Sequence, residues 1–436
     1  MCQSNRCYIV PQYLLRSIVE SNDEEVTPEV RQNADWTLRE GLVDLRAKRA
    51  DIFASLTVPR GFHAQQQQAI PHRHSIVPDV LFQQIADSDE VDEDTRGHAR
   101  AELEHIRSKI AEFKAVQEGS ASAQKPTLQA EGARGDEKEG EVAKFYRAIY
   151  DAQKNPKESK LPGKAIRLEG QDPTGDVAAD SAYDNGGLVL QFYKDKFNWS
   201  SIDNKGMHVV SSVHFGINYE NAYWDPSKMQ MVYGDGDKFL YKFAECIDVI
   251  GHEMTHAITE HTSPLNYQGQ SGALNEHVSD VFGIMVKQFK EQEKAAEADW
   301  LIGEGCLLPG VKGVALRNMK EPGTAYNDPR FGKDPQPNHM SGFKVMTADN
   351  GGVHIYSGIP NRAFCLASIA FGGFSWEKAG QIWWHTMNSG RIPPRCNFVQ
   401  FADVTVEVAD EKYGEEAAKI VREAWNTVGV VRKQGL

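Results

Sequence analysis

Residues 249–257, with the sequence VIGHEMTHA, place the pattern HExxH inside an apolar run that suits a helix. In a helix His252 and His256 stand four residues apart, so both imidazoles project from one face and can bind one metal ion. Glu253 lies beside that pair, where it can reach a water on the metal. Two imidazoles with a neighbouring carboxylate suit zinc, which keeps an open position in catalytic sites. The stretch therefore predicts a helix that carries a catalytic zinc site.

A third zinc ligand is expected. Thr259 and Thr262 stand where a pattern with a further Gly and His would need those residues, so the chain just after the helix does not supply it. A second helical pattern follows, in which Glu276 and Asp280 share one face at i and i+4. Glu276 would complete a His-His-Glu site. Asp280 would accept a hydrogen bond from one ligand imidazole, and Asn275 from the other.

Further blocks of sequence surround these two helices. They are IYDA at 149–152, LPG at 161–163, SVHF at 212–215, NAYW at 221–224, MVYGDGD at 231–237 and DNGGVH at 349–354. From about Tyr146 to the C-terminus the chain resembles a thermolysin-family zinc metallopeptidase. Within that family it resembles the protealysin-type branch, which has a short N-terminal pro-segment. The resemblance implies a zinc-dependent neutral endopeptidase.

The resemblance also implies the role of each matching catalytic residue. Glu253 would be the general base toward the attacking water and would later carry a proton to the leaving amine. His354 and Tyr267 would donate hydrogen bonds to the oxyanion, and Asp349 would orient His354 and keep it protonated. The implied zinc ligands are His252, His256 and Glu276.

Substrate-binding residues follow from the same resemblance. Asn221 and Ala222 would bind the substrate backbone along an edge strand, and Arg317 would bind the carbonyl beyond the cleaved bond. Apolar neighbours of the site imply cleavage before bulky hydrophobic residues. These neighbours are Val249, Leu316 and Val353.

The catalytic region divides into two lobes, which predicts an α+β fold of the thermolysin-like zincin type. Residues 143–262 form an expected β-rich lobe that ends in the zinc helix, and residues 263–436 form an expected helical lobe. The zinc helix would lie between the lobes. Strand-like alternation occurs at 207–215, and helical periodicity at 378–387, 397–409 and 415–428.

An internal repeat precedes the catalytic region. The tripeptide Ile-Val-Pro occurs at 9–11 and again at 76–78, an offset of 67, and each copy leads into an apolar-periodic helix start. We predict an inhibitory pro-segment at 1–57, a second copy at 68–116 and a flexible, cleavable linker at 117–142. The first copy contains PQYL at 11–14, which resembles a Pro-x-Tyr-Leu stretch of protealysin-type pro-segments. Two alternatives stay open: the second copy inhibits because it is closer to the enzyme, or both copies are helical hairpins that pack on the surface.

One departure from the family pattern concerns calcium. Thermolysin-like enzymes usually have a paired calcium site near the zinc helices, built from acidic residues. At the matching positions this chain has Asp248, Asp299 and Glu304, but also Lys287 and Leu301. A lysine ammonium would neutralise the carboxylates and repel a divalent cation. We therefore expect the double calcium site to be lost.

The composition suits an enzyme that acts on proteins. With 436 residues and a formal net charge of -13, nucleic acid and anionic membranes are not expected partners. No apolar signal region begins the sequence, and the six cysteines have no framework spacing, which predicts reduced thiols in a cytoplasmic or non-classically released protein. The alternative function is a zinc-stabilised, non-catalytic scaffold whose duplicated N-terminal segment is a binding or inhibitor module. Retention of Glu253, His354 and Tyr267 argues against it.

Overall fold

The computed structural model describes residues 74–119, 145–238, 240–330 and 332–431, with backbone only for 74–75 and 107–119. The expected pro-segment at 1–57 and residues 120–142 of the expected linker lie outside the described residues. The described residues belong to one compact unit of the chain, which begins at Gln68.

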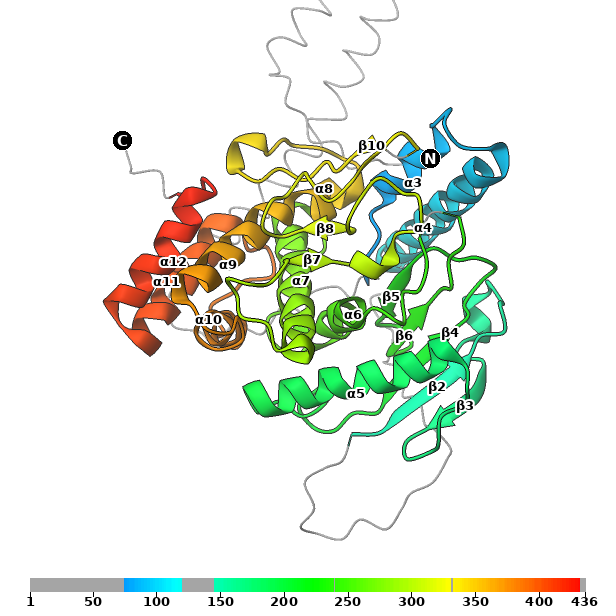
Figure 1. Cartoon of the computed structure of the whole chain (residues 1–436), viewed down its shortest axis with the longest axis horizontal. Coiled ribbons are helices and arrows are strands. Elements are labelled where there is room, and N and C mark those ends of the chain that lie inside the picture. The colour runs from blue at the N-terminus through cyan, green and yellow to red at the C-terminus, as the bar shows by residue number, and fades with distance from the viewer. Residues whose placement is uncertain (1–73, 120–144, 239, 331, 432–436) are drawn as a thin grey trace, which may run out of the picture. The chain divides into compact units, whose positions relative to one another are not determined.

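A six-stranded mixed sheet forms the N-terminal lobe, with strand order β1-β5-β6-β4-β2-β3 (Figure 1). Its central pairs β2–β4 and β4–β6 are parallel, and the remaining neighbours are antiparallel. The strands are β1 (His74–Ser75), β2 (Arg147–Asp151), β3 (Lys164–Leu168), β4 (Val209–Val213), β5 (Ala222–Asp225) and β6 (Gln230–Tyr233). All four residues of β5 and of β6 are buried, as expected of strands covered on both faces.

A long helix, α5 (Val177–Phe197), interrupts the lobe that the sequence predicts to be β-rich. Asp176 caps it, because its side chain accepts a hydrogen bond from Ala179 N at 3.0 Å. Asn198 ends it in the left-handed conformation. The helix packs on the zinc helix, where Tyr193 OH lies 2.7 Å from Thr255 Oγ1.

The zinc helix α6 (Ile247–Thr259) and helix α7 (Gly269–Glu291) cross at the centre of the described part of the chain. Two glycines allow their close approach. A Cβ on Gly283 would lie 2.6 Å from Asp248 O, and one on Gly251 would lie 3.1 Å from Gly283 Cα. Side chains at these positions would push the helices apart, so the glycines set the distance at which α7 can contribute to a site on α6.

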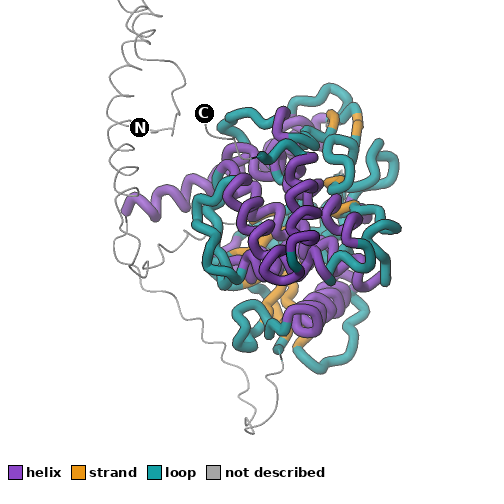
Figure 2. Tube along the Cα trace, turned by 90° about the vertical axis from the view of Figure 1, so that its left-hand side faces the viewer, coloured by secondary structure: helices purple, strands orange, loops and turns teal. Residues whose placement is uncertain are grey.

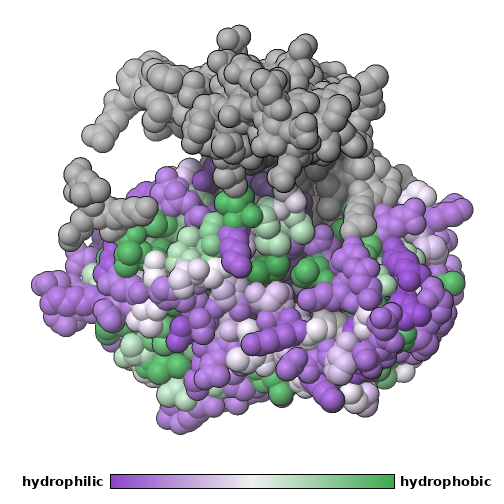
Figure 3. All heavy atoms as spheres, turned by 90° about the horizontal axis from the view of Figure 1, so that it is seen from above, coloured by the Kyte–Doolittle hydropathy of each residue, from purple (hydrophilic) through white to green (hydrophobic). Residues whose placement is uncertain are grey.

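The C-terminal lobe is helical, which confirms the predicted fold class, and its helices gather on one side of the central pair (Figure 1). It contains α8 (Asp349–Tyr356), α9 (Gly358–Phe371), α10 (Lys378–Met387), α11 (Phe398–Tyr413) and α12 (Glu415–Thr427). Short pieces lie between α7 and these helices: β7 (Leu301–Ile302), β8 (Arg317–Asn318), β9 (Asn327–Asp328), β10 (Gly332–Lys333), and the 3-10 turns η2 (Glu304–Cys306) and η3 (Met340–Gly342). A further 3-10 turn, η1 (Glu158–Lys160), lies within the sheet lobe between β2 and β3. The view in Figure 2 shows loops around a largely helical interior. On the face drawn in Figure 3 hydrophilic side chains predominate, which is consistent with the acidic composition.

The second repeat copy folds onto the catalytic part. After β1, the helix α3 (Asp79–Ala86) begins, and α4 (Glu93–Gly119) follows as an antiparallel partner (Figure 1). Leu81, Phe82 and Ile85 of α3 are at most 2% exposed and belong to the main hydrophobic core. Burying three such side chains contributes roughly 1.5–3 kcal/mol each, so this copy is a packed element and not a loose appendage.

Candidate active site

Helix α6 presents its two histidines to the interior of the protein. His252 and His256 are fully buried, and their Nε2 atoms lie 3.0 Å apart. Glu276 of α7 completes the group, with carboxylate oxygens 3.4 Å from each of these nitrogens. Ligands of a tetrahedral zinc at about 2.0–2.1 Å lie roughly 3.3 Å from one another. The three separations therefore fit a single zinc ion, and the predicted ligands are brought together.

The remaining ring nitrogens have partners that fix how the imidazoles point. His252 Nδ1 donates to Asp280 Oδ1 at 2.9 Å, and His256 Nδ1 donates to Asn275 Oδ1 at 2.8 Å. Both partners are those that the sequence predicted. Because each Nδ1 carries the proton, each Nε2 keeps its lone pair for a metal. Ser279 Oγ, at 2.9 Å from His256 Nδ1, is a further contact that sequence reasoning missed.

Glu253 stands next to the metal-binding group without joining it. Its Oε2 accepts a hydrogen bond from Trp224 N at 3.0 Å, which joins the zinc helix to strand β5. Its Oε1 is buried and has no hydrogen-bond partner in the described part of the chain. Burial and the charge of Glu276 raise the pKa of Glu253 to about 8. A buried carboxylate oxygen without a partner costs free energy, so this position suits a group that binds a water molecule or a substrate.

Tyr267 and His354 approach the group from the side of the helical lobe. Tyr267 OH donates to Glu276 Oε1 and lies 3.2 Å from His354 Nε2. His354 Nδ1 donates to Asp349 Oδ1 at 2.6 Å, as the sequence predicted. Burial lowers the pKa of His354, but the charges of Glu276 and Asp349 outweigh it and raise the pKa to about 10. An imidazolium and a phenol thus face the metal-binding group.

The turn before His354 explains how Asp349 can orient it. Asp349 and Asn350 have φ values of 50° and 47°, and Gly351 and Gly352 follow at 86° and 84°. This left-handed run turns the carboxylate of Asp349 back toward the helix, where Oδ2 accepts from His354 N at 2.8 Å. The two glycines are therefore required by the backbone conformation.

The predicted substrate-binding residues all contact the second repeat copy. Ile76 N donates to Ala222 O at 3.3 Å, and Ile76 O accepts from Arg317 Nη1 at 2.8 Å. Val77 N donates to Asn221 Oδ1 at 3.1 Å, and Val77 O accepts from Asn221 Nδ2 at 3.4 Å. Strand β1 extends the same contact by pairing antiparallel with β5. The segment thus adds a strand at the sheet edge, as extended peptides do.

Arg317 has a second function in the structure. Its Nε and Nη2 atoms donate to the two carboxylate oxygens of Asp280 at 2.9 and 2.7 Å. Asn361 Nδ2 adds a third bond to Asp280 at 2.8 Å. Burial raises the pKa of Asp280, but the charge of Arg317 and the hydrogen bond from His252 outweigh it and hold the pKa well below its usual value. Asp280 therefore stays ionised and accepts the hydrogen bond from His252 Nδ1.

Farther along α7, Lys287 occupies the centre of an acidic cluster. Its Nζ lies 3.0 Å from Asp299 Oδ2 and 3.0 Å from Glu304 Oε2, and it donates to Leu301 O at 3.4 Å. Asp248 is buried beside them and accepts from Gly303 N at 2.6 Å. Burial lowers the pKa of Lys287, but these carboxylates outweigh it and hold the pKa above its usual value.

A helix that carries two histidines and a glutamate, with a second glutamate from the next helix, defines the class of zinc metallopeptidases. Comparison with known families agrees. The thermolysin metallopeptidase catalytic domain matches residues 124–260, its alpha-helical domain matches 263–430, and the protealysin propeptide matches 74–118.

Individual relatives agree as well. Protease PrtS of Photorhabdus sp. (strain Az29) is 48% identical over 66% of this chain and 78% of that protein. An extracellular metalloprotease of Pectobacterium carotovorum subsp. carotovorum is 47% identical over 66% of this chain and 82% of its own. The solved precursor of protealysin, a metalloproteinase from Serratia proteamaculans, superimposes with a TM-score of 0.70 at 41% identity, over 82% of this chain and 100% of that chain. The chain belongs to the thermolysin family of metallopeptidases.

Membership settles the coarse function. The protein is a zinc metalloendopeptidase with a protealysin-type propeptide, and it is made as a precursor. Family membership implies a catalytic zinc, and the chain offers the group of His252, His256 and Glu276 for it.

The expected cytoplasmic or non-classically released location is wrong. One of the similar proteins is named an extracellular metalloprotease, which conflicts with a cytoplasmic enzyme. That expectation was based on the first residues and on the cysteine spacing, and these do not determine where a stably folded enzyme acts. Of the helices that the structure describes, none combines the length and apolar character needed to span a bilayer.

Proposed function

We propose that this protein hydrolyses internal peptide bonds with Glu253 as the general base. The observation that carries the proposal is the unpartnered Oε1 of Glu253 beside three ligand atoms with the spacing of a zinc site. A bound zinc would polarise the scissile carbonyl and make water nucleophilic near neutral pH. His252, His256 and Glu276 would hold it.

The steps that the chain itself performs follow from the geometry. Glu253 removes a proton from the attacking water and delivers a proton to the leaving amine nitrogen. Tyr267 and His354 donate hydrogen bonds to the oxyanion, where negative charge develops only in the transition state.

A non-catalytic scaffold would not require this arrangement. A structural zinc site needs ligands and no base, whereas here a buried base and two oxyanion donors surround the ligand group. The sharpest test replaces Glu253 by Gln, which keeps shape and removes the charge. We expect at least a 10³-fold loss of activity toward casein with zinc still bound.

The matched control is Glu260→Gln, one residue beyond α6. Glu260 is a partly buried glutamate whose pKa is raised by burial to about 7, and it accepts a hydrogen bond from Trp224 Nε1 at 2.9 Å. It does not contact the ligand group, so this variant should stay active. Equal activity of Glu253→Gln and wild type would refute the mechanism.

The second repeat copy is the inhibitor in this proposal, with the substrate-binding residues as its target. Ile76 and Val77 are at most 1% exposed and engage Asn221, Ala222 and Arg317 through the backbone. A substrate would need the same hydrogen bonds, so both cannot bind together. The match of the protealysin propeptide to residues 74–118 supports this copy over the segment at 1–57.

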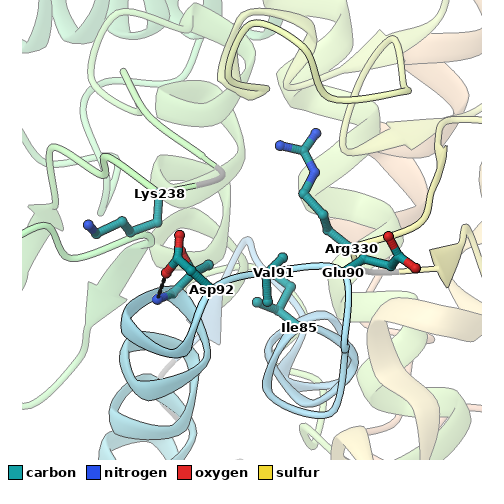
Figure 4. Close-up of a pocket in the computed structure, with 7 residues that line it drawn as sticks. Ile85, Glu90, Val91, Asp92, Lys238 and Arg330 are labelled. Atoms are coloured by element: carbon teal, nitrogen blue, oxygen red, sulfur yellow. Dashed lines mark hydrogen bonds between the residues drawn. The ribbon is translucent and has the colours of Figure 1, made fainter.

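Contacts outside the binding edge keep this copy in place. Lys238 Nζ lies 2.6 Å from Asp94 Oδ2, and His98 Nε2 donates to Asn218 O at 2.8 Å. A cavity of about 180 Å³ lies at this contact. In Figure 4 Ile85 and Val91 lie between Lys238 and Arg330, which approach from opposite sides. These polar contacts are partly exposed and weak individually, which suits a segment that must later be removed.

The repeat itself supplies a matched pair of variants. We expect Ile76→Asp with Val77→Asp to raise the basal activity of the full-length precursor or to speed its processing. The same change in the first copy, Ile9→Asp with Val10→Asp, should have little effect. The opposite result would identify the first copy as the inhibitor. Self-activation is tested by following the length of the Glu253→Gln precursor beside these variants. If the protein processes itself, Glu253→Gln should remain at full length.

Substrate preference and calcium complete the proposal. Ile76 is buried, and its carbonyl accepts a hydrogen bond from Arg317. The apolar residues that adjoin site residues in the sequence, Val249, Leu316 and Val353, are buried as well. These observations support cleavage before bulky hydrophobic residues.

We further propose that the Lys287 ammonium replaces calcium in the acidic cluster. It already contacts two carboxylates and a carbonyl there.

A further inference from the structure

Two cysteines distant in sequence meet at the start of the zinc helix. Cys246 is the residue before α6, and Cys306 is the last residue of η2. Cys306 Sγ donates to Cys246 Sγ at 3.3 Å. Cys306 is fully buried, whereas Cys246 is partly exposed. The catalytic mechanism uses neither thiol.

The backbone holds both sulfurs where they are. Cys246 O accepts the first helical hydrogen bond from Ile250 N at 3.2 Å, and Cys306 O accepts from Tyr241 N at 3.0 Å. Gly305 makes room for the contact, because a Cβ at that position would lie 3.0 Å from Cys246 Sγ. The pair is thus a packed feature of this part of the fold and not a chance approach of two mobile side chains.

We propose that Cys246 and Cys306 are a redox modification site that forms an intramolecular disulfide bond. A disulfide needs the sulfurs about 2.0 Å apart, so they must approach by about 1.3 Å. The proposal requires that rotation of the two side chains provides this movement while the helix and the turn stay in place. The other buried free cysteines, Cys365 and Cys396, have no sulfur partner among the described residues.

The oxidant is a low-molecular-weight disulfide such as oxidised glutathione. The thiolate of Cys246, the exposed member, attacks it, breaks its S–S bond and releases one glutathione, which takes up the proton that Cys246 lost. Cys306 then loses its proton and attacks the Cys246 sulfur, which forms the protein disulfide and releases the second glutathione. Two protein thiols are oxidised and one glutathione disulfide is reduced. Hydrogen bonding to Cys246 and burial raise the pKa of Cys306, which assigns it the second step.

The bond would join two segments that meet at the Lys287 cluster. Asp248 lies two residues after Cys246, and Glu304 lies two residues before Cys306. Gly303 N already donates to Asp248 Oδ2 between them at 2.6 Å. A cross-link here closes a loop of about 60 residues and constrains the unfolded chain, so it should stabilise the start of the zinc helix against thermal unfolding.

The test uses the full-length protein incubated with oxidised or reduced glutathione, then alkylated and mapped by mass spectrometry without reduction. We expect a cross-linked pair of peptides containing Cys246 and Cys306, lighter by about 2 Da, and a rise in Tm on the order of 5 °C that dithiothreitol reverses. Cys306→Ser should lose the rise, and Cys365→Ser should keep it. If both thiols are alkylated after oxidation, or if Cys246 retains glutathione or pairs with another cysteine, the proposal is wrong. The peptide map decides even if Cys306→Ser does not fold.

Discussion

Replacing Lys287 by Met removes the only positive charge that contacts the acidic cluster among the described residues. The Lys287 side chain is 9% exposed, and Asp248 beneath it is almost fully buried. Removing one partner of a fully buried ion pair costs about 3–5 kcal/mol. The Asp299 and Glu304 side chains are 38% and 53% exposed, so water screens part of the repulsion that remains. We expect a loss of about 2–3 kcal/mol, or a decrease in Tm of about 3–5 °C for a unit of this size.

The same cluster should become a calcium site when its ammonium is exchanged for a carboxylate. Lys287→Glu would place four carboxylates and the Leu301 carbonyl around one position, and hard oxygen ligands of this kind suit calcium. We expect this variant to be less stable than wild type without calcium, and millimolar calcium to restore most of the loss. Lys287→Met should gain nothing from calcium.

The assay is calorimetry in the Glu253→Gln background, which prevents self-digestion, at fixed free zinc with and without calcium. Lys290→Met is the matched control, because Lys290 lies on the same helix, is exposed and has no carboxylate contact among the described residues. It should leave Tm within about 1 °C of the parent. If wild type itself gains several degrees from calcium, or binds it with a stoichiometry near two, Lys287 does not replace the metal.

Three further outcomes are expected. Tyr267→Phe should lower kcat about 10²-fold with KM little changed, because one oxyanion donor is lost. Rate assays on a peptide substrate would measure both constants, and a change in KM alone would contradict this expectation. Asp280→Asn should weaken zinc retention about 10–100-fold in competition with a chelator, because His252 loses its anionic partner; unchanged retention would contradict it. His214 hydrogen-bonds Asp235 and Asp176, which raises its pKa to about 9. Since the folded pKa exceeds the unfolded value of about 6.5, His214→Asn should cost about 1–2 kcal/mol below pH 6.5 after allowance for partial exposure. That cost should disappear as pH rises through 9, as denaturant unfolding would show.

The zinc-binding group could be predicted from sequence because its chemistry is local. His252 and His256 are one helical turn apart, and Glu276 and Asp280 repeat that spacing on the next helix. Asn275 and Asp280, which bind the Nδ1 atoms of the two histidines, could also be predicted, because they lie close to Glu276 on the same helix.

Features that depend on distant contacts could not be predicted. Gly283 is needed only because α6 passes 2.6 Å from where its Cβ would be, and nothing in the local pattern of α7 shows that. The sulfurs of Cys246 and Cys306 meet across 60 residues of chain, so spacing gives no sign of the pair. Helix α5 was missed because its glycine and tyrosine content resembles that of a strand-rich region, whereas the Asp176 cap and burial against α6 decide its structure.

Arg317 shows why latency and zinc binding can share residues without conflict. Two of its nitrogens hold Asp280, and a third donates to the Ile76 carbonyl. The bidentate bond fixes the guanidinium plane whether or not the pro-segment is present, because Asp280 is buried and stays ionised. We therefore expect removal of the pro-segment to leave the donor aimed at the position that a substrate carbonyl would take. In the proposed mechanism the inhibitor uses the preorganisation that the enzyme needs for its substrate, and we expect its departure to leave the groups that would support the metal in place.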